Sequence, residues 1–126
     1  MYLIDTNIFL EVLLIQNKRE TCKKFLDTNV GTLYISDFSL HSIGVILFKS
    51  DKEDIFHKFL DDIIPKVEII TLPKGIYRDL AELKKNLGLD FDDAYQFNVA
   101  KEHDLKIVTM DTDFEKVKDK INVVFL

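Results

Sequence analysis

The sequence predicts an α/β fold with a mostly parallel central sheet flanked by helices. Short apolar runs rich in β-branched residues alternate with longer stretches whose apolar residues recur at helical spacing, which is typical of parallel strands joined by crossover helices. Two of the runs end close to an aspartate. The run 2–4 is followed directly by Asp5, and the run 106–109 is followed by Met110 and then Asp111. The chain has 126 residues and no repeat or linker, so we expect a single domain over residues 1–126.

Strands and helices are expected to follow one another along the chain. Apolar runs predict strands over 2–4, 32–35, 67–72, 106–109 and 121–125. Amphipathic spacing predicts helices over about 7–15, 18–28, 38–49, 54–64 and 73–87, another after Asp90, and a helical turn near Phe114. Gly88 is expected to end one helix and Asp90 to cap the next, whereas either Ser36 or Asp37 could cap the helix over 38–49.

The predicted helix over 38–49 is apolar on nearly every side. Its apolar residues are Phe38, Leu40, Ile43, Val45, Ile46, Leu47 and Phe48. A helix that is apolar all round is buried all round. The sequence leaves two alternatives open: a deep helix within the core, or a helix covered by a partner or a second subunit.

Composition and charge narrow the class of protein. A single cysteine, Cys22, excludes an internal disulfide framework, and the first residues show no secretory pattern, so we expect a cytoplasmic protein. No apolar run reaches transmembrane length, which predicts no membrane association. The net charge of −5 excludes a broad basic surface for nucleic acid, although a metal ion could recruit phosphates locally. No glycine-rich phosphate loop is present, which excludes a typical nucleoside triphosphatase.

Aspartates gather where the predicted strands end. Asp5 and Asp111 each follow a strand, and Asp93 lies in the first turn of the helix after Asp90. Sites in open parallel sheets form outside the carboxyl ends of strands, so we expect the three carboxylates to meet. Crowded carboxylates repel one another unless a cation joins them, and Mg²⁺ or Mn²⁺ suits such oxygen ligands. Alternatively, Asp93 completes a capping box with Asp90, and either Asp111 or Thr112 caps the turn near Phe114.

These motifs resemble the PIN domain family, and within it the VapC-type toxins. The resemblance rests on Leu3-Ile4-Asp5-Thr6-Asn7, on Asp93-Ala94 opening a helix, and on Ile107-Val108-Thr109-Met110-Asp111-Thr112-Asp113-Phe114. It covers essentially the whole chain and implies a Rossmann-like sheet. It also implies a Mg²⁺- or Mn²⁺-dependent endoribonuclease that acts on RNA, forms a homodimer and is held inactive by a small antitoxin, as in type II toxin–antitoxin pairs.

The resemblance assigns site residues position by position. The catalytic and metal-binding acids would be Asp5, Asp93, Asp111 and Asp113, and the polar residues that orient carboxylates or water would be Thr6, Asn7 and Thr109. Because adjacent residues of a helix point in different directions, we expect Asp92 to face solvent.

One position departs from the family pattern. The family usually has a glutamate about six residues beyond a serine in the helix after the second strand. Counting from Ser36, this chain has Ser42 there, with His41 beside it. A degenerate PIN-like binding module is therefore the alternative to the ribonuclease. A haloacid-dehalogenase-like phosphatase, which Asp111 and Asp113 after a strand could also indicate, needs further motifs downstream of Asp113.

Overall fold

The computed structural model describes residues 1–126 and has a five-stranded sheet in which every pair of neighbouring strands is parallel. The strands are β1 (Tyr2–Ile4), β2 (Leu33–Ser36), β3 (Glu68–Ile70), β4 (Lys106–Thr109) and β5 (Val123–Phe125), in the order β3-β2-β1-β4-β5. The predicted α/β class and all five strands are confirmed. The strands at the two edges, β3 and β5, are shorter than the apolar runs over 67–72 and 121–125 that predicted them.

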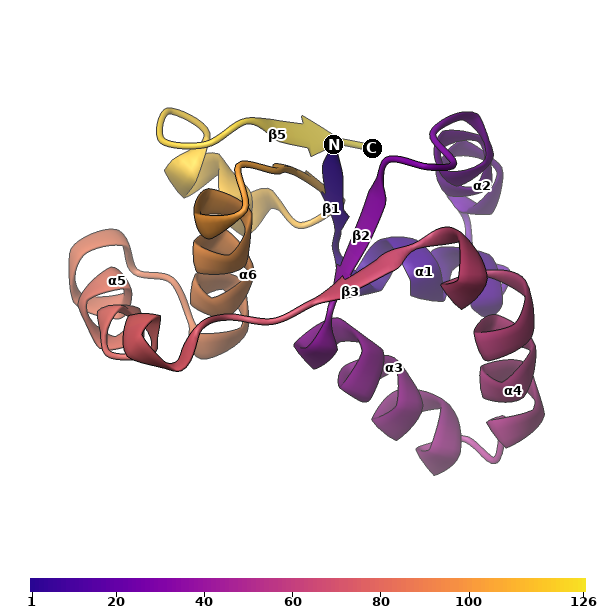
Figure 1. Ribbon diagram of the computed structural model, residues 1–126. Helices are drawn as coiled ribbons and strands as arrows, with labels where there is room; N and C mark the ends of the chain where they lie inside the picture. Colours follow the sequence, from indigo (N-terminus) through magenta and orange to yellow (C-terminus); the bar gives the residue numbers. More distant parts are fainter.

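Helices cover both faces of this sheet (Figure 1). They are α1 (Thr6–Leu13), α2 (Arg19–Thr28), α3 (Asp37–Lys49), α4 (Glu53–Asp62), α5 (Asp79–Leu87) and α6 (Phe91–Glu102), with 3₁₀ turns η1 (Ile64–Lys66), η2 (Lys74–Ile76) and η3 (Thr112–Val117). The predicted helix over 73–87 is wrong in its first turn: Pro73 precedes the short 3₁₀ turn η2, and α5 begins at Asp79. None of the helices is long and apolar enough to span a membrane.

The central strand β1 divides the hydrophobic core into two clusters. Leu3 pairs with Ile107 of β4, and both side chains join the cluster beneath α5 and α6. Ile4 pairs with Val108, and both join the cluster beneath α1 to α4. Leu3 and Ile4 thus point to opposite faces of the sheet, as successive residues of a strand do. Because β1 ends at Ile4, Asp5 lies at the carboxyl edge of the sheet.

The helix caps agree with the sequence pattern. Ser36 caps α3, its Oγ accepting a hydrogen bond from the Ser39 amide at 3.1 Å, which settles the choice that the sequence left open. Asp90 caps α6 in the same way, with the Asp93 amide donating at 3.0 Å. Gly88 ends α5 with φ 68°, a left-handed conformation that glycine adopts without strain.

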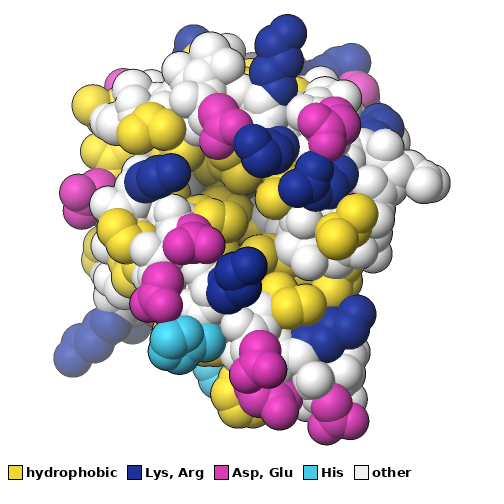
Figure 2. All heavy atoms as spheres, turned by 90° about the vertical axis from the view of Figure 1, so that its right-hand side faces the viewer, with side chains coloured by type: hydrophobic (Ala, Val, Ile, Leu, Met, Phe, Trp, Pro, Cys, Tyr) yellow, Lys and Arg dark blue, Asp and Glu magenta, His cyan; other side chains and the backbone are white.

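Helix α3 is not buried on every side. Ser39, Ile43 and Leu47 are buried, whereas Val45, Ile46 and Phe48 are exposed. The alternative of a deep core helix is therefore wrong. The helix packs one face against α1 and α4 and leaves an apolar face open. Beyond it, the surface around α2 and α4 carries hydrophobic side chains among charged ones and is hollowed at its centre (Figure 2).

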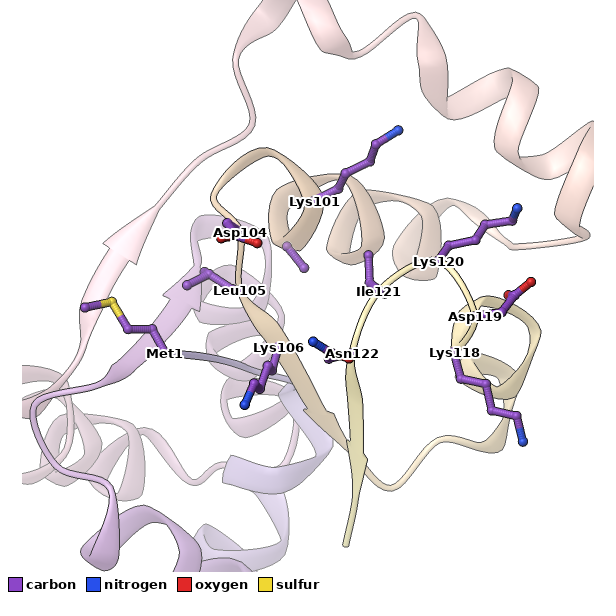
Figure 3. A pocket seen from close by; sticks show the side chains of 11 residues that line it. Met1, Lys101, Asp104, Leu105, Lys106, Lys118, Asp119, Lys120, Ile121 and Asn122 are labelled. Atoms are coloured by element: carbon purple, nitrogen blue, oxygen red, sulfur yellow. The ribbon is translucent and has the colours of Figure 1, made fainter.

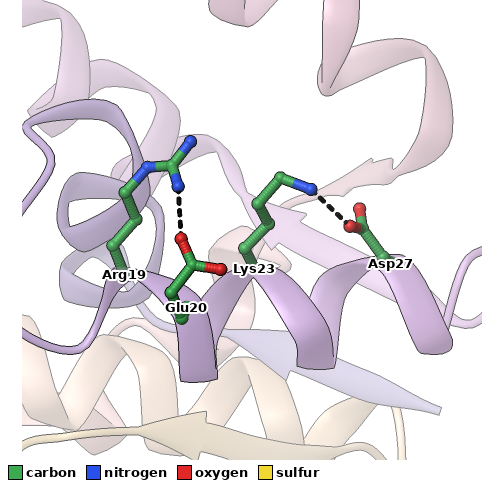
Figure 4. A network of polar contacts seen from close by, with 4 residues as sticks. All are labelled: Arg19, Glu20, Lys23 and Asp27. Carbon is green, nitrogen blue, oxygen red and sulfur yellow. Dashed lines mark hydrogen bonds and ion pairs between the residues drawn. The ribbon is translucent and has the colours of Figure 1, made fainter.

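The charged residues of α2 form local ion pairs. Lys23 Nζ lies 2.8 Å from Asp27 one turn further on, and Arg19 Nη1 lies 2.6 Å from Glu20 (Figure 4). All four side chains are at least one-third exposed, so these pairs contribute little to stability. This charge pattern is that of a solvated helix face.

Candidate metal centre at the carboxyl edge of the sheet

A cavity of about 270 Å³ lies at the carboxyl ends of β1 and β4. Residues of α1, α3 and α6 line it together with the strand ends. The lining comprises Asp5, Thr6, Asn7, Leu10, Phe38, Ser42, Ile46, Asp92, Asp93, Gln96 and Asp111. Three of the acids that the sequence predicts to converge therefore share one cavity. Ser42, which stands where the family usually has a glutamate, also lines this cavity.

Carboxylate oxygens of Asp93, Asp111 and Asp113 lie within 4.8 Å of one another. Asp93 comes from the first turn of α6, and the other two come from the start of η3 after β4. Three carboxylates at this spacing suit a hard divalent cation, which takes oxygen ligands and retains waters. Asp5 lies outside this closest group, although it lines the same cavity.

Asp93 carries a buried carboxylate that the protein does not stabilise with any hydrogen bond. Its side chain is 8% exposed, and no donor in the protein makes a hydrogen bond to its carboxylate. Burial, followed by repulsion from Asp90, Asp111, Asp5 and Asp113, raises the pKa of Asp93 to about 7. The side chain does not return the hydrogen bond of a capping box, so capping does not explain this carboxylate. A cation at the site would lower its pKa and offset its burial.

Asp5 is also buried but, unlike Asp93, accepts hydrogen bonds from the protein. It caps α1: Oδ1 accepts from the Thr6 amide at 2.9 Å and from Gln96 Nε2 at 3.3 Å, and Oδ2 accepts from Thr109 Oγ1 at 2.7 Å. Burial raises the pKa of Asp5 above its ordinary value, but these three donors act in the opposite direction because they favour the charged form. The protein itself thus stabilises this carboxylate.

Gln96 connects Asp5 to a buried polar network. Gln96 Nε2 donates to Ser39 Oγ at 2.8 Å, and Gln96 Oε1 accepts from Ser36 Oγ at 2.7 Å. Thr6 Oγ1 donates to the same Ser39 hydroxyl at 2.9 Å. Sequence reasoning did not find Gln96 or Ser39 as site residues. The one available signal was a glutamine on the helix of Asp93, three residues further on and hence on the same face.

Asp111 has the capping role that the sequence suggested. Its Oδ1 accepts a hydrogen bond from the Asp113 amide at 2.9 Å and so caps η3. Its own amide donates to Thr109 Oγ1 at 2.9 Å, which links it to the hydroxyl that holds Asp5. Capping fixes the orientation of Asp111 and leaves Oδ2 for a ligand.

Two further residues add polar character to the cavity. Asp92 is exposed, as expected, but it also lines the cavity, and partial burial and the charge of Asp90 raise its pKa. Asn7 has a buried side-chain oxygen with no hydrogen-bond partner in the protein. Such an acceptor beside several carboxylates fits a cation or the water around it, and not a further anion.

The opposite edge of the sheet lacks a comparable arrangement. A cavity of about 430 Å³ there is lined by Lys101, Lys106, Lys118 and Lys120 with Asp104 and Asp119. The lysine side chains leave its rim in different directions and do not converge on one point (Figure 3). The converging carboxylates at the carboxyl edge therefore remain the candidate site.

Solved structures with the same fold come from several organisms. A toxin–antitoxin complex from Klebsiella pneumoniae is 24% identical with a TM-score of 0.75, over 98% of this chain and 96% of the other. VapBC2 from Rickettsia felis, bound to a DNA fragment from its promoter, is 20% identical with a TM-score of 0.77, over 99% and 98%. VapC20 from Mycobacterium tuberculosis, a toxin that cleaves the sarcin-ricin loop, is 12% identical with a TM-score of 0.73, over 85% and 87%.

The family is shown by the sequence itself. A comparison with curated proteins finds no significant match. The family model of the PIN domain, however, matches residues 2–120, nearly the whole chain, and the fold agrees with that match. The resemblance seen in the aspartate motifs is thereby confirmed: this chain belongs to the PIN domain family.

Proposed function

We propose that this chain is a Mg²⁺- or Mn²⁺-dependent endoribonuclease that acts as the toxin of a type II toxin–antitoxin pair. The observation that carries the proposal is the environment of Asp93: a buried carboxylate without a hydrogen-bond donor, beside carboxylate oxygens of Asp111 and Asp113 within 4.8 Å. Membership of the PIN domain family supports a nuclease. RNA as the substrate is supported by the similarity to VapC20, a toxin that cleaves an RNA loop.

In this proposal the carboxylates have distinct tasks. Asp93, Asp111 and Asp113 hold the cation, and Asp5 holds it directly or through water from the position that Thr6, Gln96 and Thr109 give it. A bound divalent cation supplies polarisation of the scissile phosphodiester and a lower pKa for an attacking water. The Asn7 oxygen orients water near the acids.

The proposed partners are a small antitoxin and a second copy of the chain. Similarity to toxin–antitoxin complexes supports the antitoxin. The exposed apolar side chains of α3, Val45, Ile46 and Phe48, support a subunit interface, because exposed hydrophobic patches mark contact surfaces. We also propose that residues 1–126 form a single PIN domain and that the protein acts in the cytoplasm.

Ser42 favours a second candidate, a catalytically degenerate PIN-like binding module. It lines the cavity where the family usually has a glutamate. Three acids with retained waters still suffice for a magnesium shell, which is why we prefer the enzyme.

Cleavage of a labelled single-stranded RNA across a Mn²⁺ titration separates the two candidates. The enzyme predicts metal-dependent cleavage that Asp93→Asn abolishes and that an exposed control, Asp79→Asn in the first turn of α5, leaves unchanged. If the wild type never cleaves and Ser42→Glu does, the binding module is the correct function.

A further inference from the structure

A second cavity, of about 460 Å³, adjoins the acidic one along α3. It is lined by Asp37, Phe38, His41, Ser42, Tyr77, Phe91 and Tyr95. Phe38 and Ser42 line both cavities, so the two lie side by side. A polymer whose phosphodiester reaches the acids can therefore place a neighbouring unit at this aromatic cavity.

The walls of the second cavity are aromatic rings from three segments of the chain. Tyr95 of α6 forms the buried back, with its ring centroid 5.8 Å from that of Phe38 and 5.9 Å from that of Tyr77. Tyr77 and Phe91 stand at the front, 44% and 58% exposed. Rings of this size left open to water beside a catalytic cavity offer faces on which a planar base can stack.

The Asp37 carboxylate is a polar group of this cavity, and one of its two oxygens already accepts hydrogen bonds from the protein. Its Oδ1 accepts from Tyr95 Oη at 2.5 Å and from the Phe38 amide at 2.9 Å. A tyrosine hydroxyl carries its proton at neutral pH, so Tyr95 is the donor in this contact. Both acceptor positions of Oδ1 are therefore used, and Oδ2, which has no donor in the protein, remains to accept from a ligand.

We propose that this cavity is a subsite for a nucleobase next to the cleaved phosphodiester, and that it prefers a base with an exocyclic amino group, such as cytosine, over uracil. The inference rests on the proposed function for RNA as the substrate. Cytosine presents an amino donor at the position where uracil presents a carbonyl acceptor. A carboxylate oxygen accepts from the first and repels the second.

Binding of short oligocytidine and oligouridine, followed by fluorescence anisotropy in EDTA, tests the subsite without cleavage. The measurement uses the Asp93→Asn background, which also removes one charge that repels phosphates. Loss of a stacking ring corresponds to a dissociation constant roughly tenfold or more weaker. We expect Phe91→Ala and Tyr77→Ala to have this effect. Phe125→Ala, a matched control on β5 that is 37% exposed and lines neither cavity, should leave binding unchanged.

Asp37→Asn tests the direction of the hydrogen bond. The amide oxygen must still face the donors Tyr95 and Phe38, so the amide nitrogen replaces Oδ2 and turns an acceptor into a donor. We expect the preference to change from oligocytidine to oligouridine. A purely structural role of Asp37 would weaken both ligands equally.

The outcomes separate this inference from the proposed function. If the wild type cleaves RNA but the aromatic variants bind as well as the control does, the subsite is refuted and the ribonuclease stands. If Phe91→Ala abolishes oligocytidine binding while the wild type cleaves nothing in Mn²⁺, the subsite stands and the ribonuclease is refuted.

Discussion

Replacing Asp93 by asparagine should stabilise the metal-free protein at neutral and alkaline pH. The folded protein holds this carboxyl at a pKa of about 7, against an ordinary value of 3.8. Below pH 4 both the folded and unfolded states carry the proton, so the group contributes nothing. Between pH 4 and 7 the unfolded state releases the proton first, and stability falls as the pH rises. Above pH 7 the full cost of the buried charge is present.

The magnitude follows from the two pKa values. A difference of about three pH units at about 1.36 kcal/mol each corresponds to at most about 4 kcal/mol. This is a large fraction of the roughly 5–15 kcal/mol by which domains are stable. Asparagine has nearly the same shape and no charge, so we expect a gain of about 2–4 kcal/mol at pH 8 and little gain at pH 4.

Urea unfolding at pH 4.5, 6 and 8 in EDTA measures this difference. Asp79→Asn is the matched control, because Asp79 also lies in the first turn of a helix but is exposed and distant from the cavity. Saturating Mn²⁺ at pH 8 should reverse the order, since a ligand that binds only the folded wild type stabilises it. The reasoning is refuted if Asp93→Asn has the same effect on unfolding at pH 4.5 and pH 8, or lowers stability at pH 8.

Three further predictions concern other residues of the site and surface. Asp5→Asn should weaken Mn²⁺ binding about 10- to 100-fold by calorimetry, the usual loss when a group around a metal centre is removed, and equal binding would exclude Asp5 from the site. Ser42→Glu should tighten Mn²⁺ binding and speed RNA cleavage but lower the melting temperature in EDTA, because it adds a carboxylate to a crowded cavity. If none of these three quantities changes, Ser42 does not occupy the position of the family glutamate. Phe48→Glu should convert a homodimer to a monomer in light scattering, because it places a charge in the exposed apolar face of α3; a wild type that is monomeric at every concentration would contradict the homodimer.

The sheet was predictable because its central strands are buried on both faces. A short β-branched run such as 106–109 is typical of a buried parallel strand, and the structure has β4 at the same bounds. The segment 73–87 was less predictable because tertiary packing sets where a helix starts. Leu72 and Leu80 are buried in the cluster under α6, whereas Tyr77 remains exposed, and the backbone between them turns to reach both positions.

The position of the acidic cavity was also predictable, since parallel strands bring their carboxyl ends to one edge. The polar network behind it was not. Gln96 meets Asp5, Ser36 and Ser39 across 91, 60 and 57 positions of the chain. No periodicity links residues so far apart, and serine or glutamine in a helix normally indicates a surface position.

The network explains why this fold tolerates two buried aspartates only a short distance apart. Asp5 receives three donors from the protein, which favour its charged form and so oppose the effect of burial before any ligand arrives. Asp93 receives none, and its charge is opposed by Asp90, Asp111, Asp5 and Asp113. Asp93 therefore has no hydrogen bond from the protein to offset the cost of its buried charge, and in the metal-free protein it can avoid that cost by holding a proton near pH 7. Metal binding must displace that proton, so affinity for a divalent cation should rise with pH through this range. Ser42 in place of a fifth lining carboxylate keeps this cost from growing further.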